Sequence, residues 1–598
     1  MMAAALLACV LAQAPDERAI SGKVVDGAGR PVGGVVVVVT GANLIRVASG
    51  RGYAPPRVLT GADGRFVFRS LPDGSFDLTA TKNGYAEGAY GRRRPSGSSK
   101  SVVLSAARPL EDISISIWKT GAISGTLTDE AGEPIVNARL RLCKATLVGG
   151  ARRFASARQT AMTDDRGEYR FGNLVPGDYI VAVSAPRPSL TVSGLEMVGQ
   201  RRQAPAAMMT ALPGLPTAVT VLDAVYGVGP GAIVPPPLAN GHLMVYPPTF
   251  YASTPSVTSA TVIRLASGED RSGIDIQLQP IASGRVAGVL IASDGPGAGA
   301  LVRLESTALD GVQLGDAGGE DDLITLADSA GRFVFPAVPF GDYRLRAAGG
   351  PSNREWTNTP LSVAGDLDPI VVTMRPPIKI IGRYVYEGGL DAPESASGGT
   401  SQSSMRPAPF MLLPADGSAL VLNGLSAFTS PQGFTMEGFT SGRYFGRVAE
   451  SPRGWMFKSA VSRGVDISEI PIDLTDDITD LVITFTNQWS GIGGTVHDAG
   501  GAPDAAAAVL VFPANADAWR NYGPAPRRLK SGPTNARGEF GISSLPPGEY
   551  YAVAIPEDDS DNWRDPETLD ALARVATTVT IGEGEHRTIE LHTQRVPR

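Results

Sequence analysis

The sequence has little of what most catalytic chemistry and most cross-linking require. Only two cysteines, four histidines and eight lysines occur in 598 residues, and charged residues make up 19% of the chain. No stretch reaches the roughly 18–20 consecutive apolar residues that a membrane-spanning helix needs. These scarcities exclude a disulfide scaffold, a coiled coil and a channel of transmembrane helices.

What is present points to several globular domains. Glycine (71) and proline (47) are abundant, and 43% of the residues are hydrophobic, which is ample for packed cores. At roughly 100–200 residues per domain, the length corresponds to about three to six domains. The formal net charge is −7, and arginine carries nearly all the positive charge. An acidic chain without a long basic run is a poor binder of nucleic acid or of an anionic membrane.

The first fourteen residues, MMAAALLACVLAQA, form a signal-like segment. The apolar run ends in Ala12-Gln13-Ala14, the small-x-small pattern of a secretory cleavage site, although no basic residue precedes it. Leu6-Leu7-Ala8-Cys9 also resembles a lipoprotein box, so lipidation of Cys9 is an alternative to cleavage. Both interpretations predict an extracytoplasmic protein. The other cysteine, Cys143, lies in an alternating apolar segment and is expected to be a buried small hydrophobe.

One sequence pattern occurs five times, and each copy opens with a short strand that we expect to end in glycine. In the clearest copies a turn follows, Asp26–Pro31 or Asp129–Pro134, and leads into a second apolar strand. The opening glycines lie 103, 163, 94 and 112 residues apart, at Gly22, Gly125, Gly288, Gly382 and Gly494.

Each copy continues with a hairpin turn that leads into an aromatic residue. A glycine follows eight residues later, and a second aromatic two residues after that glycine. This spacing holds in all five copies: Phe66, Gly74 and Phe76; Tyr169, Gly177 and Tyr179; Phe333, Gly341 and Tyr343; Phe434, Gly442 and Tyr444; Phe540, Gly548 and Tyr550. So regular a repeat predicts a tandem architecture.

The local patterns identify the repeating unit as a sandwich. Phe66-Val67-Phe68 alternates with period two, which puts both rings on one face of a strand. Proline-rich corners such as Leu71–Gly74 end a ladder, because proline gives no N–H and glycine accepts positive φ. Each copy then closes with two more short strands. The sequence therefore predicts an all-β fold, a tandem array of about five Ig-like or transthyretin-like antiparallel β-sandwich domains.

One short helix is expected near the C-terminus, at Pro566–Ala576 with Asp565 as its cap. The predicted segments are a signal-like stretch at 1–14 and sandwiches at 15–118, 119–279, 280–376, 377–488 (the most divergent) and 489–598. The second sandwich carries an insertion rich in proline, glycine and alanine at 186–255. That insertion is either a loop draped over its own or neighbouring domains, or a docking surface for a partner.

Several strings resemble a known family. Ile123–Pro134, Gly167–Phe171 and Pro176–Tyr179 are similar to carboxypeptidase regulatory-like domains, which belong to the transthyretin-like and starch-binding-like sandwiches. The resemblance covers most of the chain, clearly in copies one, two and five. It implies a bacterial exported protein whose modules accompany peptidases, transporters or adhesins, and it supplies no shared catalytic residues.

Catalytic and metal-binding patterns are weak. His586 and His592 share a strand face but lie roughly 20 Å apart at strand spacing, so they cannot share an ion. We expect a solvated strand there, no metal site and no cofactor. Asp164, Asp165 and Asp328 stand beside turn glycines, where carboxylates commonly accept backbone N–H bonds. No nucleophile elbow, phosphate loop or dinucleotide fingerprint occurs, so the chain is not expected to be an enzyme.

Three aromatic residues of the last sandwich are candidates for binding carbohydrate: Trp519, Tyr522 and Trp563. They stand in polar or proline-rich loops beside Asn, Asp and Arg, and a flat ring can stack on a sugar face. The alternative is that they pack beneath their own loops.

Three hypotheses for function follow. The first is a non-catalytic, exported structural or interaction protein at the cell envelope, whose partner is an envelope protein or a polysaccharide. The second is a carbohydrate-binding protein that uses the loop aromatics. The third is an accessory subunit of a peptidase or outer-membrane transporter complex that docks through the insertion at 186–255.

Overall fold

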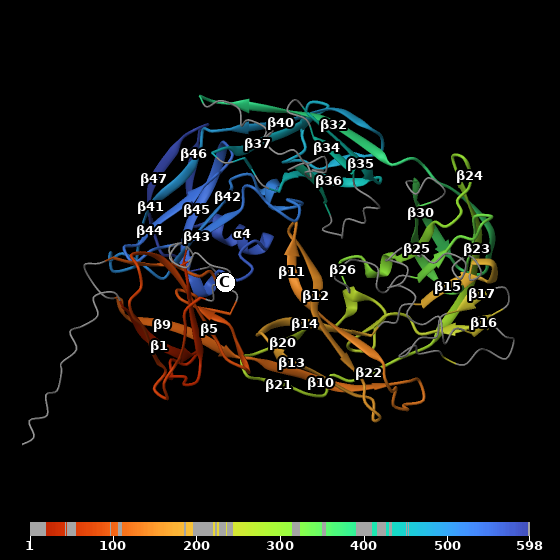
Figure 1. Cartoon of the computed structure of the whole chain (residues 1–598), viewed down its shortest axis with the longest axis horizontal. Coiled ribbons are helices and arrows are strands. Elements are labelled where there is room, and N and C mark those ends of the chain that lie inside the picture. Colours follow the sequence, from red (N-terminus) through yellow and green to blue (C-terminus); the bar gives the residue numbers. More distant parts are fainter. Residues whose placement is uncertain are drawn as a thin grey trace, which may run out of the picture. The chain divides into compact units, whose positions relative to one another are not determined.

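The computed structural model describes residues 19–41, 44, 55–95, 97–105, 110–183, 187–194, 219–221, 224–226, 235, 243–313, 323–349, 355–389, 410–415, 426–429, 433–449, 451–452 and 454–595 (Figure 1). The signal-like segment and Cys9 lie outside these residues. The chain divides into two compact units, one formed by Met1–Ile123, Gly172–Gly177 and Arg264–Arg271, and one by the remaining residues. In the described residues no helix has both the length and the apolarity to cross a membrane.

The first unit contains the first sandwich, drawn in red in Figure 1. Its two sheets enclose a core that includes Val24, Phe66, Phe68, Phe76 and Ile115. One sheet has the order β4-β1-β9-β6, and the other has the order β3-β2-β5-β7 with β8 also on β5. The strands are β1 (Ile20–Asp26), β2 (Val36–Thr40), β3 (Arg57–Leu59), β4 (Arg65–Phe68), β5 (Gly74–Thr81), β6 (Tyr85–Ala86), β7 (Gly88–Ala89), β8 (Val102–Leu104) and β9 (Leu110–Lys119).

The second sandwich begins with β10, whose end in the second unit pairs with β22. Its larger sheet has the order β19-β14-β11-β12-β26, with β20 also on β14. Cys143 is buried in that sheet, as predicted. The strands are β10 (Gly121–Thr128), β11 (Arg139–Val148), β12 (Ala151–Met162), β13 (Glu168–Leu174), β14 (Gly177–Val183), β19 (Thr249–Phe250), β20 (Ile263–Leu265), β21 (Asp270–Arg271) and β22 (Ile276–Gln277); β26 (Val312–Gln313) comes from the third copy.

The third sandwich includes strands from the insertion of the second. One sheet has the order β16-β17-β15-β27-β25-β29-β30, and in the other β23 pairs with β18, β24, β28 and β31. The insertion supplies β15 (Arg187–Thr191), β16 (Val219–Val221), β17 (Ala224–Tyr226) and β18 (Met244–Val245). The remaining strands are β23 (Ile281–Ala292), β24 (Gly295–Pro296), β25 (Leu301–Ser306), β27 (Leu323–Leu326), β28 (Arg332–Pro339), β29 (Gly341–Gly349), β30 (Glu355–Val363) and β31 (Leu367–Thr373).

The fourth and fifth sandwiches follow the same plan. The fourth has sheets β34-β35-β32-β40-β37-β38 and β33-β36-β39, and the fifth has sheets β44-β41-β47 and β43-β42-β45-β46. The fourth comprises β32 (Ile378–Glu387), β33 (Phe410–Pro414), β34 (Ser426–Thr429), β35 (Phe434–Phe439), β36 (Gly442–Val448), β37 (Met456–Ser462), β38 (Val465–Asp466), β39 (Ile472–Leu474) and β40 (Ile478–Thr486). The fifth comprises β41 (Gly491–His497), β42 (Ala507–Pro513), β43 (Lys530–Pro533), β44 (Glu539–Ser543), β45 (Gly548–Pro556), β46 (Thr577–Ile581) and β47 (His586–His592).

The predicted helix is α4 (Pro566–Ala573), which ends three residues before the predicted end. The Asp565 carboxylate accepts the backbone N–H of Glu567, as expected of a cap. Leu569 and Leu572 are fully buried, so this face anchors the helix on the fifth sandwich. Short 3₁₀ turns also occur in the described residues: η2 (Val257–Ser259), η3 (Thr307–Leu309), η4 (Ala516–Trp519) and η5 (Glu557–Asp559).

The opening glycines lie inside their strands, so the prediction that the strand ends there is wrong. Gly22 of β1 stands opposite Phe66 of antiparallel β4 and Ile113 of parallel β9. A Cβ at Gly22 would overlap the carbonyl oxygen of Ile113, and a Cβ at Gly494 would overlap that of Ile589. The glycine is therefore required because two neighbouring strands approach it closely.

The pairing of the first strand also differs from the predicted antiparallel sandwich. The first strand pairs in parallel with the last in the first, third, fourth and fifth copies: β1 with β9, β23 with β31, β32 with β40, and β41 with β47. The two closing strands of a copy lie in different sheets, as β8 on β5 and β9 on β1 show. Among the described strands of these four sandwiches, the other ladders are antiparallel, apart from the parallel pair that β15 of the insertion makes with β27.

The second glycine of each repeat begins a strand, and in the third, fourth and fifth copies the tyrosine two residues later closes a tyrosine corner. Gly548 has a φ of +155°, which favours glycine over residues with a side chain. The Tyr550 hydroxyl donates to the carbonyl of Pro546 at 2.6 Å, and Tyr343 and Tyr444 make the equivalent bonds to Pro339 and Thr440. The Gly-x-Tyr spacing therefore places a buried tyrosine whose hydroxyl bonds the backbone four residues earlier and so stabilises the corner.

Candidate interaction site

The three candidate sugar-binding aromatics are buried. Trp519, Tyr522 and Trp563 are 4%, 8% and 7% exposed, and they form a second core with Phe512 and the inner face of α4. The indole N–H of Trp519 donates to the Pro513 carbonyl at 2.7 Å, and its ring meets Phe512 edge-on. This burial favours the alternative interpretation, packing beneath their own loops, and sugar binding by these rings stays a prediction.

The candidate metal and turn residues also have structural surroundings. His586, Glu590 and His592 are exposed on β47, the solvated face that the sequence predicts. The sequence did not reveal that His592 stands beside His497 on parallel β41, with ring centroids 5.8 Å apart. Within the described residues, no group of three or more His, Cys, Asp or Glu side chains is placed to hold a metal ion.

The turn carboxylates accept backbone donors, as predicted for Asp164 and Asp328. Asp164 accepts the N–H groups of Arg166 and Glu168, and Asp328 accepts those of Ala330 and Arg332. These bonds fix the hairpins that precede the aromatic strands.

The described parts of the insertion at 186–255 pack on the third sandwich. β15 pairs in parallel with β27, and β18 pairs antiparallel with β23. Side chains fasten these strands, because Ser189 Oγ donates to the Val334 carbonyl at 2.8 Å and Ser193 Oγ donates to Asp328 Oδ2 at 2.6 Å. The insertion is thus, where described, a set of added strands that ties the second sandwich to the third.

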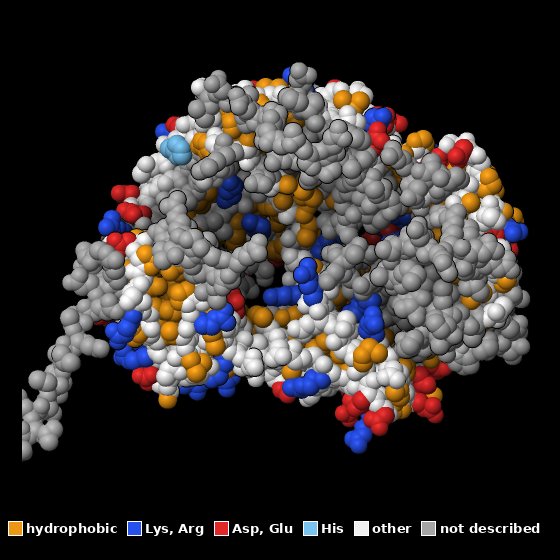
Figure 2. All heavy atoms as spheres, viewed as in Figure 1, with side chains coloured by type: hydrophobic (Ala, Val, Ile, Leu, Met, Phe, Trp, Pro, Cys, Tyr) orange, Lys and Arg blue, Asp and Glu red, His pale blue; other side chains and the backbone are white. Residues whose placement is uncertain are grey.

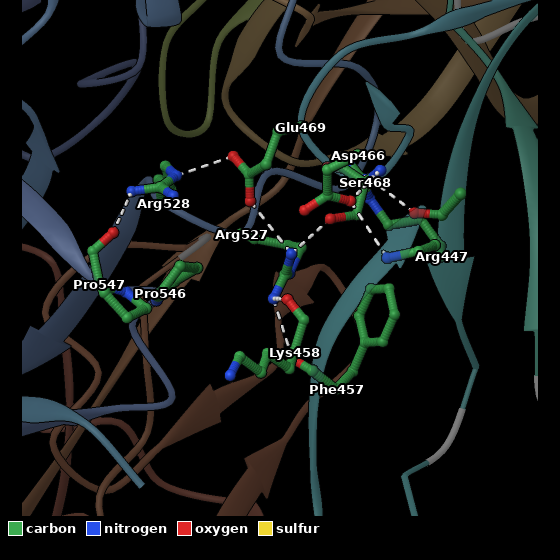
Figure 3. Close-up of polar contacts among 12 residues, drawn as sticks. Arg447, Phe457, Lys458, Asp466, Ser468, Glu469, Arg527, Arg528, Pro546 and Pro547 are labelled. Carbon is green, nitrogen blue, oxygen red and sulfur yellow. Dashed lines mark hydrogen bonds and ion pairs between the residues drawn. The ribbon is translucent and has the colours of Figure 1, made fainter. Parts of the chain in front are cut away.

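A cluster of three arginines joins the fourth and fifth sandwiches (Figure 3). Arg447 lies on β36 of the fourth sandwich and is 6% exposed, whereas Arg527 and Arg528 lie in the loop before β43 of the fifth. Sequence analysis did not single out any of them, because nothing in their spacing marks the partners they meet. We call Arg447, Glu469, Arg527 and Arg528 the arginine joint.

Arg447 and Arg527 reach across the joint in opposite directions. Arg447 Nε donates to the Ala525 carbonyl of the fifth sandwich at 2.8 Å. Arg527 Nη2 donates to the carbonyls of Phe457 and Lys458 of the fourth sandwich at 2.9 and 2.8 Å, and its guanidinium lies 4.6 Å from the centre of the Phe457 ring. Each sandwich therefore donates hydrogen bonds to backbone carbonyls of the other.

Glu469 lies between the two arginines of the loop, as Figure 3 shows. Its Oε1 accepts from Arg527 at 3.0 Å and its Oε2 from Arg528 at 2.7 Å. Burial, together with the charge of Arg527, lowers the pKa of Arg447 to about 10. Burial also lowers the pKa of Arg527, whereas for Arg528 burial is outweighed by the charge of Glu469 and the pKa is raised. One carboxylate thus holds two partly desolvated guanidinium groups, which makes it central to the joint.

The same loop also meets the second sandwich. The backbone N–H of Asn521 donates to the carbonyl of Gly149 at 2.8 Å, at the tip of the hairpin between β11 and β12. A Cβ at Gly150 would lie 2.7 Å from the Trp519 carbonyl oxygen, so this tip fits closely against the loop.

Acidic and basic side chains are both present on the surface (Figure 2). The formal charge of −7 is spread over 60 acidic and 53 basic residues.

These features define a protein of tandem β-sandwiches, several of which are hydrogen-bonded to one another within the second unit. More particularly, residues 19–113 and 122–206 match the carboxypeptidase regulatory-like domain family. The chain contains two such domains in tandem, and the suspected resemblance is confirmed for these copies. No protein with a curated description matches the sequence.

Similar solved structures include three pilins. A streptococcal ancillary pilin is 11% identical, with 60% of this chain and 99% of that chain covered and a TM-score of 0.19. The minor pilin of Streptococcus agalactiae is 14% identical, with 44% and 96% covered and a TM-score of 0.19. The major pilin subunit of Bacillus cereus is 12% identical, with 52% and 99% covered and a TM-score of 0.15. TM-scores this low support no conclusion about function.

Proposed function

We propose that the chain is a non-catalytic, extracytoplasmic structural protein of the cell envelope, in which interlocked β-sandwiches present loops to an envelope protein or a polysaccharide. The observation that supports this proposal is the set of contacts that connect one sandwich to another. The insertion adds strands to the third sandwich, and the arginine joint connects the fourth to the fifth. A chain that only needed to carry independent binding modules would not require buried charges at a joint.

Two further features support the proposal. The residues that could have carried chemistry take part in structure, since the loop tryptophans pack in a core and the turn aspartates accept backbone bonds. The signal-like sequence of residues 1–14 supports export. We also propose the domain boundaries 15–118, 119–279, 280–376, 377–488 and 489–598.

Cell fractionation tests the location. An antibody against the chain should recover the protein with the envelope or medium fractions and not with the cytoplasm. Treatment of intact cells with a non-permeant protease, with a cytoplasmic marker as control, would separate surface display from periplasmic retention. Recovery in the cytoplasm alone would contradict the proposal.

A further inference from the structure

A cavity of about 350 Å³ lies in the fifth sandwich, where the edge strands of its two sheets face each other. Lys530 and Ser531 of β43 line one side, Gly541 and Ser543 of β44 line another, and Arg564, just before the cap of α4, completes the polar lining. This volume falls in the range of small-molecule sites. All of these residues belong to one sandwich.

Two cations line the cavity, and no carboxylate does. Lys530 Nζ donates to the carbonyls of Ser543 and Ser544, both at 2.7 Å, which uses two of the three N–H groups of an ammonium. The guanidinium of Arg564 lies 5.3 Å from the centre of the Trp563 ring, and its buried Nε has no hydrogen-bond partner among the described residues.

The geometry points to a binding site for an oxyanion carried by a sugar, with Lys530 and Arg564 as its cationic partners; we propose this as a second role of the fifth sandwich. Guanidinium and ammonium groups form charge-assisted hydrogen bonds with carboxylate and phosphate oxygens. Ser531 and Ser543 also line the cavity, and serine hydroxyls can bond the neutral hydroxyls of a sugar ring. The site does not depend on the structural role proposed above.

The charge on Lys530 gives the site a pH dependence. Burial, together with the charge of Arg527, lowers the pKa of Lys530 to about 8. The cations near it are Arg527, from the loop before β43, and Arg564, which also lines the cavity. Anion binding should therefore be strongest below pH 8 and weaken as the pH rises through 8, because Lys530 then loses its proton.

Calorimetric titration of the full chain with glucuronate, glucose 6-phosphate and glucose tests the proposal. We expect at least one anionic sugar to bind at pH 7 and glucose to bind at least about tenfold more weakly. Lys530→Met and Arg564→Met should each weaken the anionic sugar roughly tenfold or more, since each removes a charge-assisted bond. Arg537→Met, an exposed arginine of the same sandwich, is the matched control and should leave the affinity unchanged.

Lys530→Arg shows whether Lys530→Met loses binding through the lost charge or because the variant fails to fold. It keeps the positive charge, so it should retain binding at pH 9, where the unmodified chain has weakened. Comparison of the two anionic sugars shows whether carboxylate or phosphate is the preferred oxyanion. Equal binding of glucose, no binding of either anionic sugar, or unchanged affinity in both methionine variants would overturn the site. Inorganic phosphate that binds as tightly as glucose 6-phosphate would overturn the part of the proposal that names a sugar.

Discussion

Asp328 has no exposed surface, yet it is held as a carboxylate by the donors around it. Burial opposes the charge, but the Ser193 hydroxyl, two backbone N–H groups and Arg332 Nε outweigh it, so the pKa is lowered. A lowered carboxyl pKa contributes stability above the ordinary value of about 3.9, and that stability is lost as the pH falls through the folded-state pKa. Asp328 thus accepts hydrogen bonds both from its own turn and from Ser193 in the first part of the insertion.

Trp563→Ala should destabilise the fifth sandwich by about 3–5 kcal/mol, because the ring is buried in the second core and its removal leaves a cavity. Hydrogen exchange of the β45 amides in the full chain is the appropriate measurement, since a multidomain chain has no single melting transition. Trp489→Ala is the control, because that ring is 39% exposed and should cost less than about 1 kcal/mol. Unchanged exchange together with lost retention on a polysaccharide would restore this ring as a binding residue.

Among the elements, the first strand of a copy is packed closely by neighbouring strands on both sides. β1 and β41 each pair with an antiparallel strand on one side and a parallel strand on the other. The parallel pairing of β1 shifts register at Gly22, which lets the carbonyl of Ile113 approach the position where a Cβ would stand. This close approach, rather than a turn, explains why the pattern opens with glycine.

Gly125→Ala should therefore destabilise the second sandwich by about 3 kcal/mol or more, because the new Cβ would overlap the carbonyl of Ile274 and one strand must move. Gly172→Ala, in β13 of the same sandwich, meets nothing within 4 Å and should be close to neutral. Thermal unfolding followed by limited proteolysis at the second sandwich compares the two variants. Similar loss in both would show that strand propensity, not the close approach, makes glycine necessary.

At the scale of the whole molecule, several copies of the second unit are connected by long-range contacts as well as by the chain. Within the second unit, the insertion strands, the hairpin tip at Gly149 and the arginine joint each connect one sandwich to another. Buried charged groups at such a contact are costly to separate, because each would lose its partner in a poorly solvated place. These contacts favour sandwiches that are held to one another over domains that move independently.

Glu469→Gln should loosen the arginine joint. The amide still accepts one hydrogen bond, but it no longer neutralises Arg527 and Arg528, and we expect a cost of about 2 kcal/mol. Exchange of the amides at residues 522–530 should then rise about 30-fold. Glu590→Gln, which changes an exposed carboxylate on β47, is the matched control and should leave this exchange unchanged. Equal exchange in the two variants would show that the joint does not depend on Glu469.

The amino-acid sequence alone determined the tandem β-sandwich architecture, the capped helix and the turn aspartates. These features depend on residues close together in the chain: period-two alternation, the Gly-x-Tyr spacing after a proline corner, and carboxylates two to four residues from the donors they accept. Such short-range steric and hydrogen-bonding rules can be read without knowing the fold.

Only the tertiary structure decided how the copies pair and which side chains are accessible. Trp519 and Trp563 sit among polar neighbours in the sequence, but α4 and the loop fold over them. Arg527 meets Glu469 although 58 residues separate them. Burial and charge pairing arise from contacts between distant segments, and no local pattern contains the geometry that brings those segments together.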